Sequence, residues 1–145
     1  MDRIWIIVIG GLLPAFAFGL AAIFQKGAAL SGVGPGTYLA YAGLVFVGGG
    51  LLMRLVLGET GWAGAGAPSA LLGGLGFAIG TGAISFAVLR LGAPISLIAP
   101  VTVISTLVTV VLGFVVFREH EGADAVRLLG GALLVMAGAA LVASS

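Results

Sequence analysis

Five stretches of apolar residues, each about as long as a membrane is thick, dominate this 145-residue sequence. A helix needs about 20 residues to cross a ~30 Å hydrocarbon core. The stretches cover residues 4–24, 37–57, 67–89, 93–117 and 124–143. Strands of a membrane barrel alternate polar and apolar side chains, and runs such as 104–117 show no such alternation. We therefore predict an all-α integral membrane protein with five transmembrane helices, whose backbones are satisfied internally in lipid.

The composition supports a membrane protein with a single domain. Hydrophobic residues make up 61% of the chain and charged residues 8%, against roughly 45 to 50% apolar residues in soluble domains. The connections between the apolar stretches are short, so residues 1–145 are predicted to form one transmembrane domain. The chain has no cysteine, which excludes disulfides and thiolate sites, and its net charge of +1 includes no basic cluster. We expect contact with membrane lipid, no cofactor and no nucleic-acid partner.

The two sides of the membrane differ slightly in the number of basic residues predicted at the helix ends and in the connections. One side holds four (Arg3, Arg54, Arg118 and Arg127) and the other holds two (Lys26 and Arg90). The positive-inside rule then favours a cytoplasmic amino terminus in the inner or plasma membrane, but so small a bias is compatible with insertion in both orientations. The first apolar stretch resembles a secretory signal with Ala15-Phe16-Ala17 at the cleavage position, yet its apolar character continues through Phe24 and favours an uncleaved helix.

Three of the predicted helices carry small or polar residues along one face. In the fourth, the hydroxyl residues have i, i+3, i+4, i+7 spacing and share a face: Thr102, Ser105, Thr106 and Thr109. The third has a similar face with Gly74, Ala78, Thr81, Gly82 and Ser85. The first has Gly11, Ala15, Gly19 and Ala22, leading to Gln25 and Lys26. Membrane helices pack through small and hydroxyl residues, so these faces indicate either helix packing alone or a polar pathway.

Other residues complete the set of pathway candidates. Tyr41 lies one turn inside the second helix, where its hydroxyl needs a partner or water. Pro14 and Pro100 interrupt hydrogen bonding in the first and fourth helices and are predicted helix breaks. The fifth helix has no polar side chain between Leu128 and Ala143, which is typical of a scaffold or a subunit contact.

The charged row Phe117-Arg118-Glu119-His120-Glu121-Gly122 first suggests a reactive or metal-binding site. Consecutive residues on a short loop cannot all converge on one ion, and no second ligand cluster exists in the sequence. We predict no metal site and no catalytic residues. Arg118 suits a helix carboxyl end and Asp124 suits the next amino end, so the row is interpreted as a boundary between two helices.

From Thr81 onward, the sequence TGAISFAVLRLGAPISLIAPVTVISTLVTVVLGFVVFREHEGADAVRLLGGALLVMAGAAL resembles the EamA-type repeat of the drug/metabolite transporter superfamily. The resemblance lies in the short turn after the third helix, Pro100 in the fourth, an acidic residue after it and a glycine-punctuated fifth. The family's loop acid corresponds to Glu121, nine positions before Gly130, with Glu119 as the competing assignment. The amino-terminal PAFAFGLAAIFQKGA also looks like the family's first helix.

This resemblance implies a transporter. An enzyme is not expected, because no nucleophile, base and orienting group can be assembled within a predicted span. Full-length members join two five-helix repeats of opposite orientation, so one repeat implies a partner, most simply a second, antiparallel copy that recreates the inverted repeat. No acidic residue lies in the middle of a predicted span, unlike in small multidrug transporters, whose first helix carries a glutamate. We expect a homodimeric secondary transporter for a small neutral, zwitterionic or amphipathic metabolite, with the fifth helix as a candidate contact. A non-transporting membrane subunit and a lipid-carrier flippase subunit are the alternatives.

Overall fold

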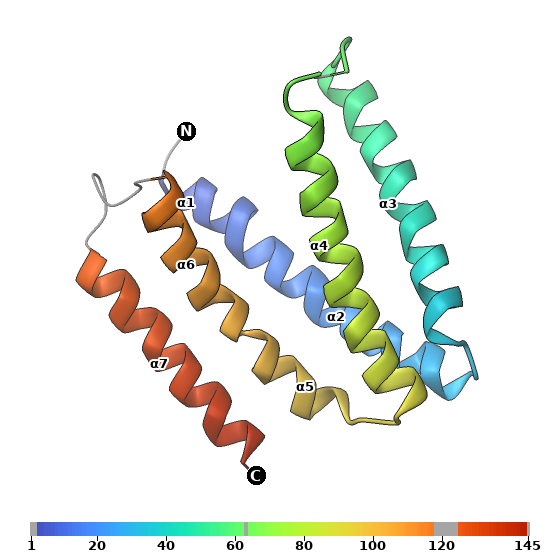
Figure 1. The fold of residues 1–145 in the computed structure, drawn as a ribbon, viewed down its shortest axis with the longest axis vertical. Coiled ribbons are helices and arrows are strands. Elements are labelled where there is room, and N and C mark those ends of the chain that lie inside the picture. Colours follow the sequence, from blue (N-terminus) through green and yellow to red (C-terminus); the bar gives the residue numbers. More distant parts are fainter. Residues whose placement is uncertain (1–2, 63, 118–124, 145) are drawn as a thin grey trace. The chain divides into compact units, whose positions relative to one another are not determined.

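The computed structural model describes residues 3–62, 64–117 and 125–144. In these ranges the chain forms five helical segments joined by short connections (Figure 1). The first consists of α1 (Arg3–Ile7), the π-helical turn η1 (Val8–Leu12) and α2 (Leu13–Leu30). The next two are α3 (Pro35–Leu57) and α4 (Ala67–Ser85), the latter continued by the π-helical turn η2 (Phe86–Arg90). The last two are α5 (Ile95–Thr102) with α6 (Ile104–Phe117), and α7 (Ala125–Ala143). The predicted all-α class is confirmed.

Four of these segments are long and apolar enough to cross a membrane: Val8–Leu30, Pro35–Leu57, Ala67–Arg90 and Ile95–Val116. The fifth contains a shorter apolar stretch, Val126–Val142. One predicted boundary is wrong, because the first helix continues to Leu30 instead of ending at residue 24. Gln25 and Lys26 therefore lie within α2, not in a connection. The apolar residues after them extend the helix until the left-handed Gly32 ends it.

Glycines in the left-handed conformation end three helical segments. Gly32, Gly58 and Gly92 have φ values of 77°, 68° and 72°, a conformation that costs other L-residues about 1 to 2 kcal/mol. After α3, the Glu59 N–H donates to the Arg54 carbonyl at 3.0 Å and the Gly58 N–H donates to the Leu55 carbonyl at 3.4 Å. These are the two hydrogen bonds of a Schellman cap, which satisfies carbonyls at the helix end.

The two helix-interior prolines have different surroundings. Pro14 lies at the start of α2, directly after η1, in which the Leu13 N–H donates to the Val8 carbonyl. A wide π turn accommodates the missing N–H and the bulk of the ring without ending the helix. Pro100 lies inside α5, which ends two residues later. There the Thr106 N–H donates to the Val103 carbonyl at 2.9 Å, forming a tight turn between α5 and α6.

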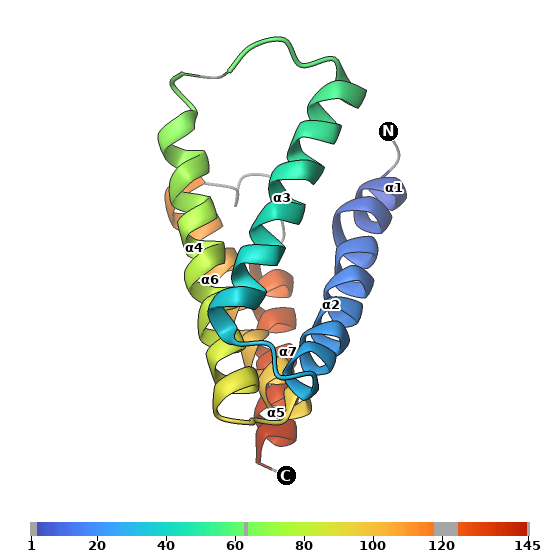
Figure 2. The same cartoon turned by 90° about the vertical axis from the view of Figure 1, so that its right-hand side faces the viewer.

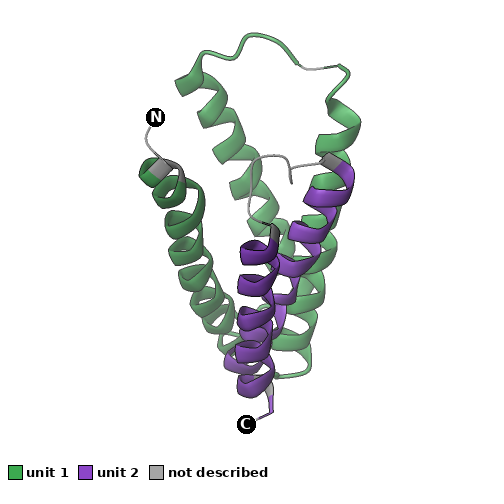
Figure 3. Ribbon diagram, turned by 90° about the vertical axis from the view of Figure 1, so that its left-hand side faces the viewer, with its two compact units in different colours: residues 1–93 green, residues 94–145 purple. Residues whose placement is uncertain are grey.

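The described chain forms two compact units, residues 1–93 (unit 1) and 94–145 (unit 2), coloured green and purple in Figure 3. In unit 1, α3 and α4 form a hairpin joined by residues 58–66 (Figure 2), and η2 packs against α2 and α3. In unit 2, α7 packs along α5 and α6. Ala132 and Ala139, two small residues of α7 spaced seven positions apart, are buried. The predicted single domain is not tested by this division and stays a prediction.

Candidate functional site

A hydrogen bond between two buried side chains joins α2 to the end of α4. Gln25 Nε2 donates to Ser85 Oγ at 2.8 Å. The side chains are 5% and 0% exposed, and neighbouring Val88 of η2 is 1% exposed. A polar group inside an apolar span costs free energy unless it is hydrogen-bonded, and this bond offsets part of that cost for both side chains. The bond can form only in a narrow range of rotations of α2 relative to α4.

Packing in unit 1 is concentrated at the same end. Gln25 lies five residues before Leu30, and Ser85 lies five residues before Arg90, so both are near the ends that lead to the connections 31–34 and 91–94. Half-buried residues of α3, among them Leu39 and Ala42, also lie in its first half. From Leu44 to Met53, α3 has only exposed residues, and so does α4 from Ala67 to Gly80. Unit 1 is therefore closed at one end and loosely packed at the other.

A cavity of about 470 Å³ lies between α2, α3 and α4. Helix α3 lines it with Leu39, Ala42, Gly43 and Phe46, and α4 lines it with Gly74, Phe77, Ala78 and Thr81. Both sets have i, i+3, i+4, i+7 spacing, so each helix contributes one continuous face. Helix α2 contributes Phe18. Phe46 is the central residue of α3, and the cavity extends from there toward the closed end.

Thr81 is the one polar side chain that lines this cavity. It lies one helical turn before Ser85 on the same face of α4. Its hydroxyl makes no hydrogen bond with any residue that the structure describes. The aromatic walls are accessible, since Phe18, Phe46 and Phe77 are 63%, 67% and 66% exposed. The cavity is thus an open, aromatic and uncharged space, and its lining on α4 stops at Thr81, one helical turn before Ser85.

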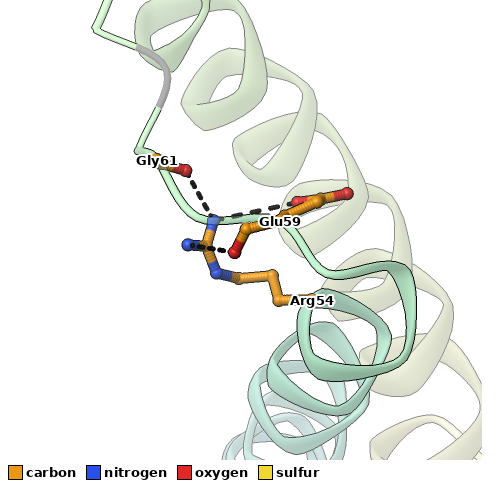
Figure 4. A network of polar contacts seen from close by, with 3 residues as sticks. All are labelled: Arg54, Glu59 and Gly61. Carbon is orange, nitrogen blue, oxygen red and sulfur yellow. Dashed lines mark hydrogen bonds and ion pairs between the residues drawn. The ribbon is translucent and has the colours of Figure 1, made fainter.

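A second polar cluster lies at the opposite end of α3 (Figure 4). Arg54 donates through Nη1 to the Gly61 carbonyl at 3.0 Å and through Nη2 to the Glu59 carbonyl at 3.3 Å. Its guanidinium carbon lies 4.2 Å from the centre of the Trp62 ring, and Nη1 lies 3.8 Å from a carboxylate oxygen of Glu59. These contacts organise the connection 58–66 at the helix end, where a cation–π stack is favourable.

Three of the predicted pathway residues come together in unit 1: Gln25, Ser85 and Thr81. Lys26 is half-buried beside Gln25. Tyr41 is exposed and lies on the face of α3 opposite the cavity. The hydroxyl residues of the fourth predicted helix are exposed in unit 2, and Glu121 and the charged row 118–122 lie outside the described residues.

In unit 2, two of the four hydroxyls donate to their own helix. Thr102 Oγ1 bonds to the Ala99 carbonyl at 2.7 Å, and Thr109 Oγ1 bonds to the Ser105 carbonyl at 2.9 Å. Their oxygens can still accept hydrogen bonds. The predicted role of this face in a pathway is not tested by these contacts.

The aromatic walls of the cavity were not among the predicted site residues. A polar side chain within an apolar span is recognisable in the sequence as a candidate site residue. The sequence does not distinguish a phenylalanine that faces lipid from one that faces a cavity, and this applies to Phe18, Phe46 and Phe77. The useful signal is periodic: each Phe shares a helix face with small residues, as Phe77 does with Gly74 and Ala78. Such a face leaves space that the aromatic rings do not fill.

Comparisons with protein-family models, curated proteins and solved structures find no match to this chain. The resemblance to the EamA-type repeat is therefore not shown. What the fold establishes is a class: the chain is a small, all-helical protein with four long apolar helices, typical of a multi-span integral membrane protein.

Proposed function

We propose that this protein is a small secondary transporter, not an enzyme, and that it moves a small neutral, zwitterionic or amphipathic molecule by alternating access. One observation carries the proposal: the open cavity lined by Thr81 lies one helical turn from the buried Gln25–Ser85 pair, which is at the tightly packed end of unit 1. A transporter in one of its two states has this form, with a site near the middle of the helices and a single closed end.

The closed end has the properties of a gate. Its polar contact is a single hydrogen bond, and such bonds between membrane helices contribute only about 0.6 kcal/mol on average. It is followed immediately by η2, a π-helical turn of five residues, and π turns occur frequently at functional sites. If α2 separates from the end of α4, the Gln25–Ser85 hydrogen bond and the packing of Val88 are lost. A path then opens from the cavity toward the connections 31–34 and 91–94.

The proposal includes the fifth crossing and a dimer. Helix α7 has 19 residues, close to the length that spans a membrane, and its side chains Val126, Leu134 and Leu141 are exposed. We propose that this face contacts lipid or a second copy of the chain. An antiparallel pair, as the resemblance to EamA-type repeats implies, cannot form unless the chain inserts in both orientations.

Site-specific labelling tests whether the cavity belongs to a pathway. The chain has no cysteine, so single cysteines can be introduced without removing others. A thiol reacts as its thiolate, which requires water. In liposomes, Thr81→Cys should react with a membrane-impermeant maleimide. Ile79→Cys should not react, because residue 79 lies on the opposite, exposed face of α4, which the proposal places in lipid, away from water. Equal protection of both cysteines would favour a packing subunit and contradict the proposal.

A further inference from the structure

We infer that the unit 1 cavity selects a neutral, mainly apolar molecule that carries one hydrogen-bonding group, and that Thr81 is the residue that recognises this group. The inference rests on the proposed function in taking the cavity as the transport site. It narrows the substrate class, because it excludes zwitterions and ions. Three features of the described residues support it: the charge of the lining, the free hydroxyl and the aromatic walls.

The first feature is the absence of charge in the cavity lining. None of its residues is ionisable. The described basic residues of unit 1 helices lie near helix ends, and Arg54 is occupied by carbonyls of the connection 58–66 and by Trp62. An ion in the cavity would have no counter-charge, and an unpaired charge at membrane depth is strongly unfavourable. A zwitterion would bring two such charges.

The second feature is the hydroxyl of Thr81. Threonines in helices commonly donate to a carbonyl of the preceding turn, as Thr102 and Thr109 do here. Within the described part of the chain Thr81 makes no such bond, although it lines the cavity. Its hydroxyl can therefore both donate to and accept from a ligand. In an apolar site, one such group discriminates between ligands with and without a hydrogen-bonding partner.

The third feature is the shape and composition of the walls. The cavity is lined by the aromatic side chains Phe18, Phe46 and Phe77, by Leu39 and by alanine and glycine residues, in addition to Thr81. Phenylalanine rings favour apolar and aromatic partners in stacked or edge-to-face contacts. The volume of about 470 Å³ lies in the range of ~300 to 1,000 Å³ typical of small-molecule sites. A one- or two-ring body with a hydroxyl or similar group fits these walls and Thr81.

Four naphthalene probes of similar size test the inference. They are 2-naphthol (neutral, with a hydroxyl), naphthalene (no hydrogen-bonding group), 2-naphthoate (anionic) and N,N,N-trimethyl-2-naphthylammonium (cationic). Saturable binding to the purified full-length protein in nanodiscs is measured by equilibrium dialysis, with empty nanodiscs as the blank for partitioning into lipid. We expect 2-naphthol to bind most tightly, naphthalene more weakly, and the two ions not to saturate.

Three variants locate the binding. Thr81→Val keeps the side-chain shape and should weaken 2-naphthol binding about five-fold, the equivalent of one hydrogen bond, without affecting naphthalene. Thr37→Val, at an exposed threonine on the face of α3 opposite the cavity, is the matched control and should bind like the wild type. Gly74→Leu should remove binding of both probes, because it fills the cavity. A Cβ at Gly74 meets no atom within 4 Å, so this variant should fold.

The outcomes separate this inference from the proposed function. Binding of either ion as tight as that of 2-naphthol, unchanged 2-naphthol affinity in Thr81→Val, or no saturable binding of any probe would overturn the inference. Labelling of Thr81→Cys by the impermeant maleimide tests the pathway without any probe. A labelled Thr81→Cys together with tight ion binding would leave the transporter proposal standing and overturn only the substrate class.

Discussion

Gln25 and Ser85 are 60 residues apart in the chain, and their side chains meet in a buried hydrogen bond of 2.8 Å. This bond joins the first and third long helices at the end where unit 1 is packed most tightly. It lies one helical turn beyond Thr81, which lines the cavity. The contact that joins these helices is therefore the one that we propose as the gate of the candidate site.

Loss of either partner should reduce stability, and the effects should not add. Gln25→Leu leaves Ser85 buried without its partner, and Ser85→Ala does the same to Gln25. In double-mutant cycles on bacteriorhodopsin, the coupling energy of an interhelical hydrogen bond is about 0.6 kcal/mol on average and at most about 1.7 kcal/mol. We expect a coupling energy in this range from unfolding in a denaturing detergent titration.

Ser31→Ala is the control for this cycle, because Ser31 is exposed and bonds to the Gly27 carbonyl of its own helix. Combined with Gln25→Leu, it should give additive effects. If Gln25→Leu and Ser85→Ala were also additive, the hydrogen bond would have no energetic role.

The left-handed cap of α3 gives a second prediction. Gly58→Ala places a Cβ at φ 68° and should lower the free energy of unfolding by about 1 to 2 kcal/mol. Gly49→Ala in the interior of the same helix meets no atom within 4 Å of its Cβ and should be neutral or stabilising, since alanine favours helix by up to about 1 kcal/mol. The same unfolding titration measures both, and equal effects would contradict the cap geometry.

The Arg54 cluster should depend on the shape of the guanidinium more than on its ion pair. The Glu59 side chain is 53% exposed and its carboxylate is 3.8 Å away, and exposed pairs contribute about 0 to 1 kcal/mol. Arg54→Lys keeps the charge but loses the planar fork that bonds two carbonyls and stacks on Trp62. Proteolysis of the connection 58–66 should accelerate in Arg54→Lys and change little in Glu59→Gln. A larger effect of Glu59→Gln would show that the ion pair dominates.

Replacement of Pro100 should regularise the turn between α5 and α6. Pro100→Ala supplies an N–H for the Ser96 carbonyl and removes the ring that crowds it. Amide hydrogen exchange near Val103 and Thr106 should become slower, because the tight turn there can return to regular helix. Exchange rates equal to those of the wild type would show that the turn has another cause. Pro94→Ala, before the start of α5, serves as the control.

The sequence predicts the helices of this protein better than it predicts their contacts. Membrane length and hydropathy place all five segments, and the one wrong end, at residue 24 instead of Leu30, arises because polar Gln25 and Lys26 look like a connection. Gln25 and Ser85 are each predictable as unusual polar residues. Their pairing is not predictable, because the two residues are 60 positions apart and their contact depends on how α2 and α4 are rotated relative to each other.

The aromatic walls of the cavity show a related limit. An apolar residue in a membrane protein can face lipid, another helix or a cavity, and hydrophobicity alone does not separate the three. Phe46 and Leu44 are equally apolar neighbours on α3, yet only Phe46 lines the cavity. Helix phase relative to the packed faces decides between them, and the tertiary structure sets that phase.

The rate at which Thr81→Cys reacts from each side of the membrane tests the central claim most directly. An impermeant maleimide added outside liposomes labels the fraction of molecules whose connection 58–66 faces outward. Thr60→Cys in that connection measures this fraction, and Ser31→Cys measures the remainder. We predict a fast phase for Thr81→Cys equal to the Thr60→Cys fraction, then a slow phase that labels the other molecules through the closed end.

Removal of the Gln25–Ser85 bond should accelerate the slow phase. A hydrogen bond of about 0.6 to 1.7 kcal/mol corresponds to a rate increase of about 3- to 20-fold in Gln25→Leu. The same maleimide enclosed inside the liposomes should label the complementary fractions of Thr60→Cys and Ser31→Cys, which checks which side each connection faces. Labelling that stops at the Thr60→Cys fraction, and stays there in Gln25→Leu, would show that the closed end does not open and would contradict transport by alternating access.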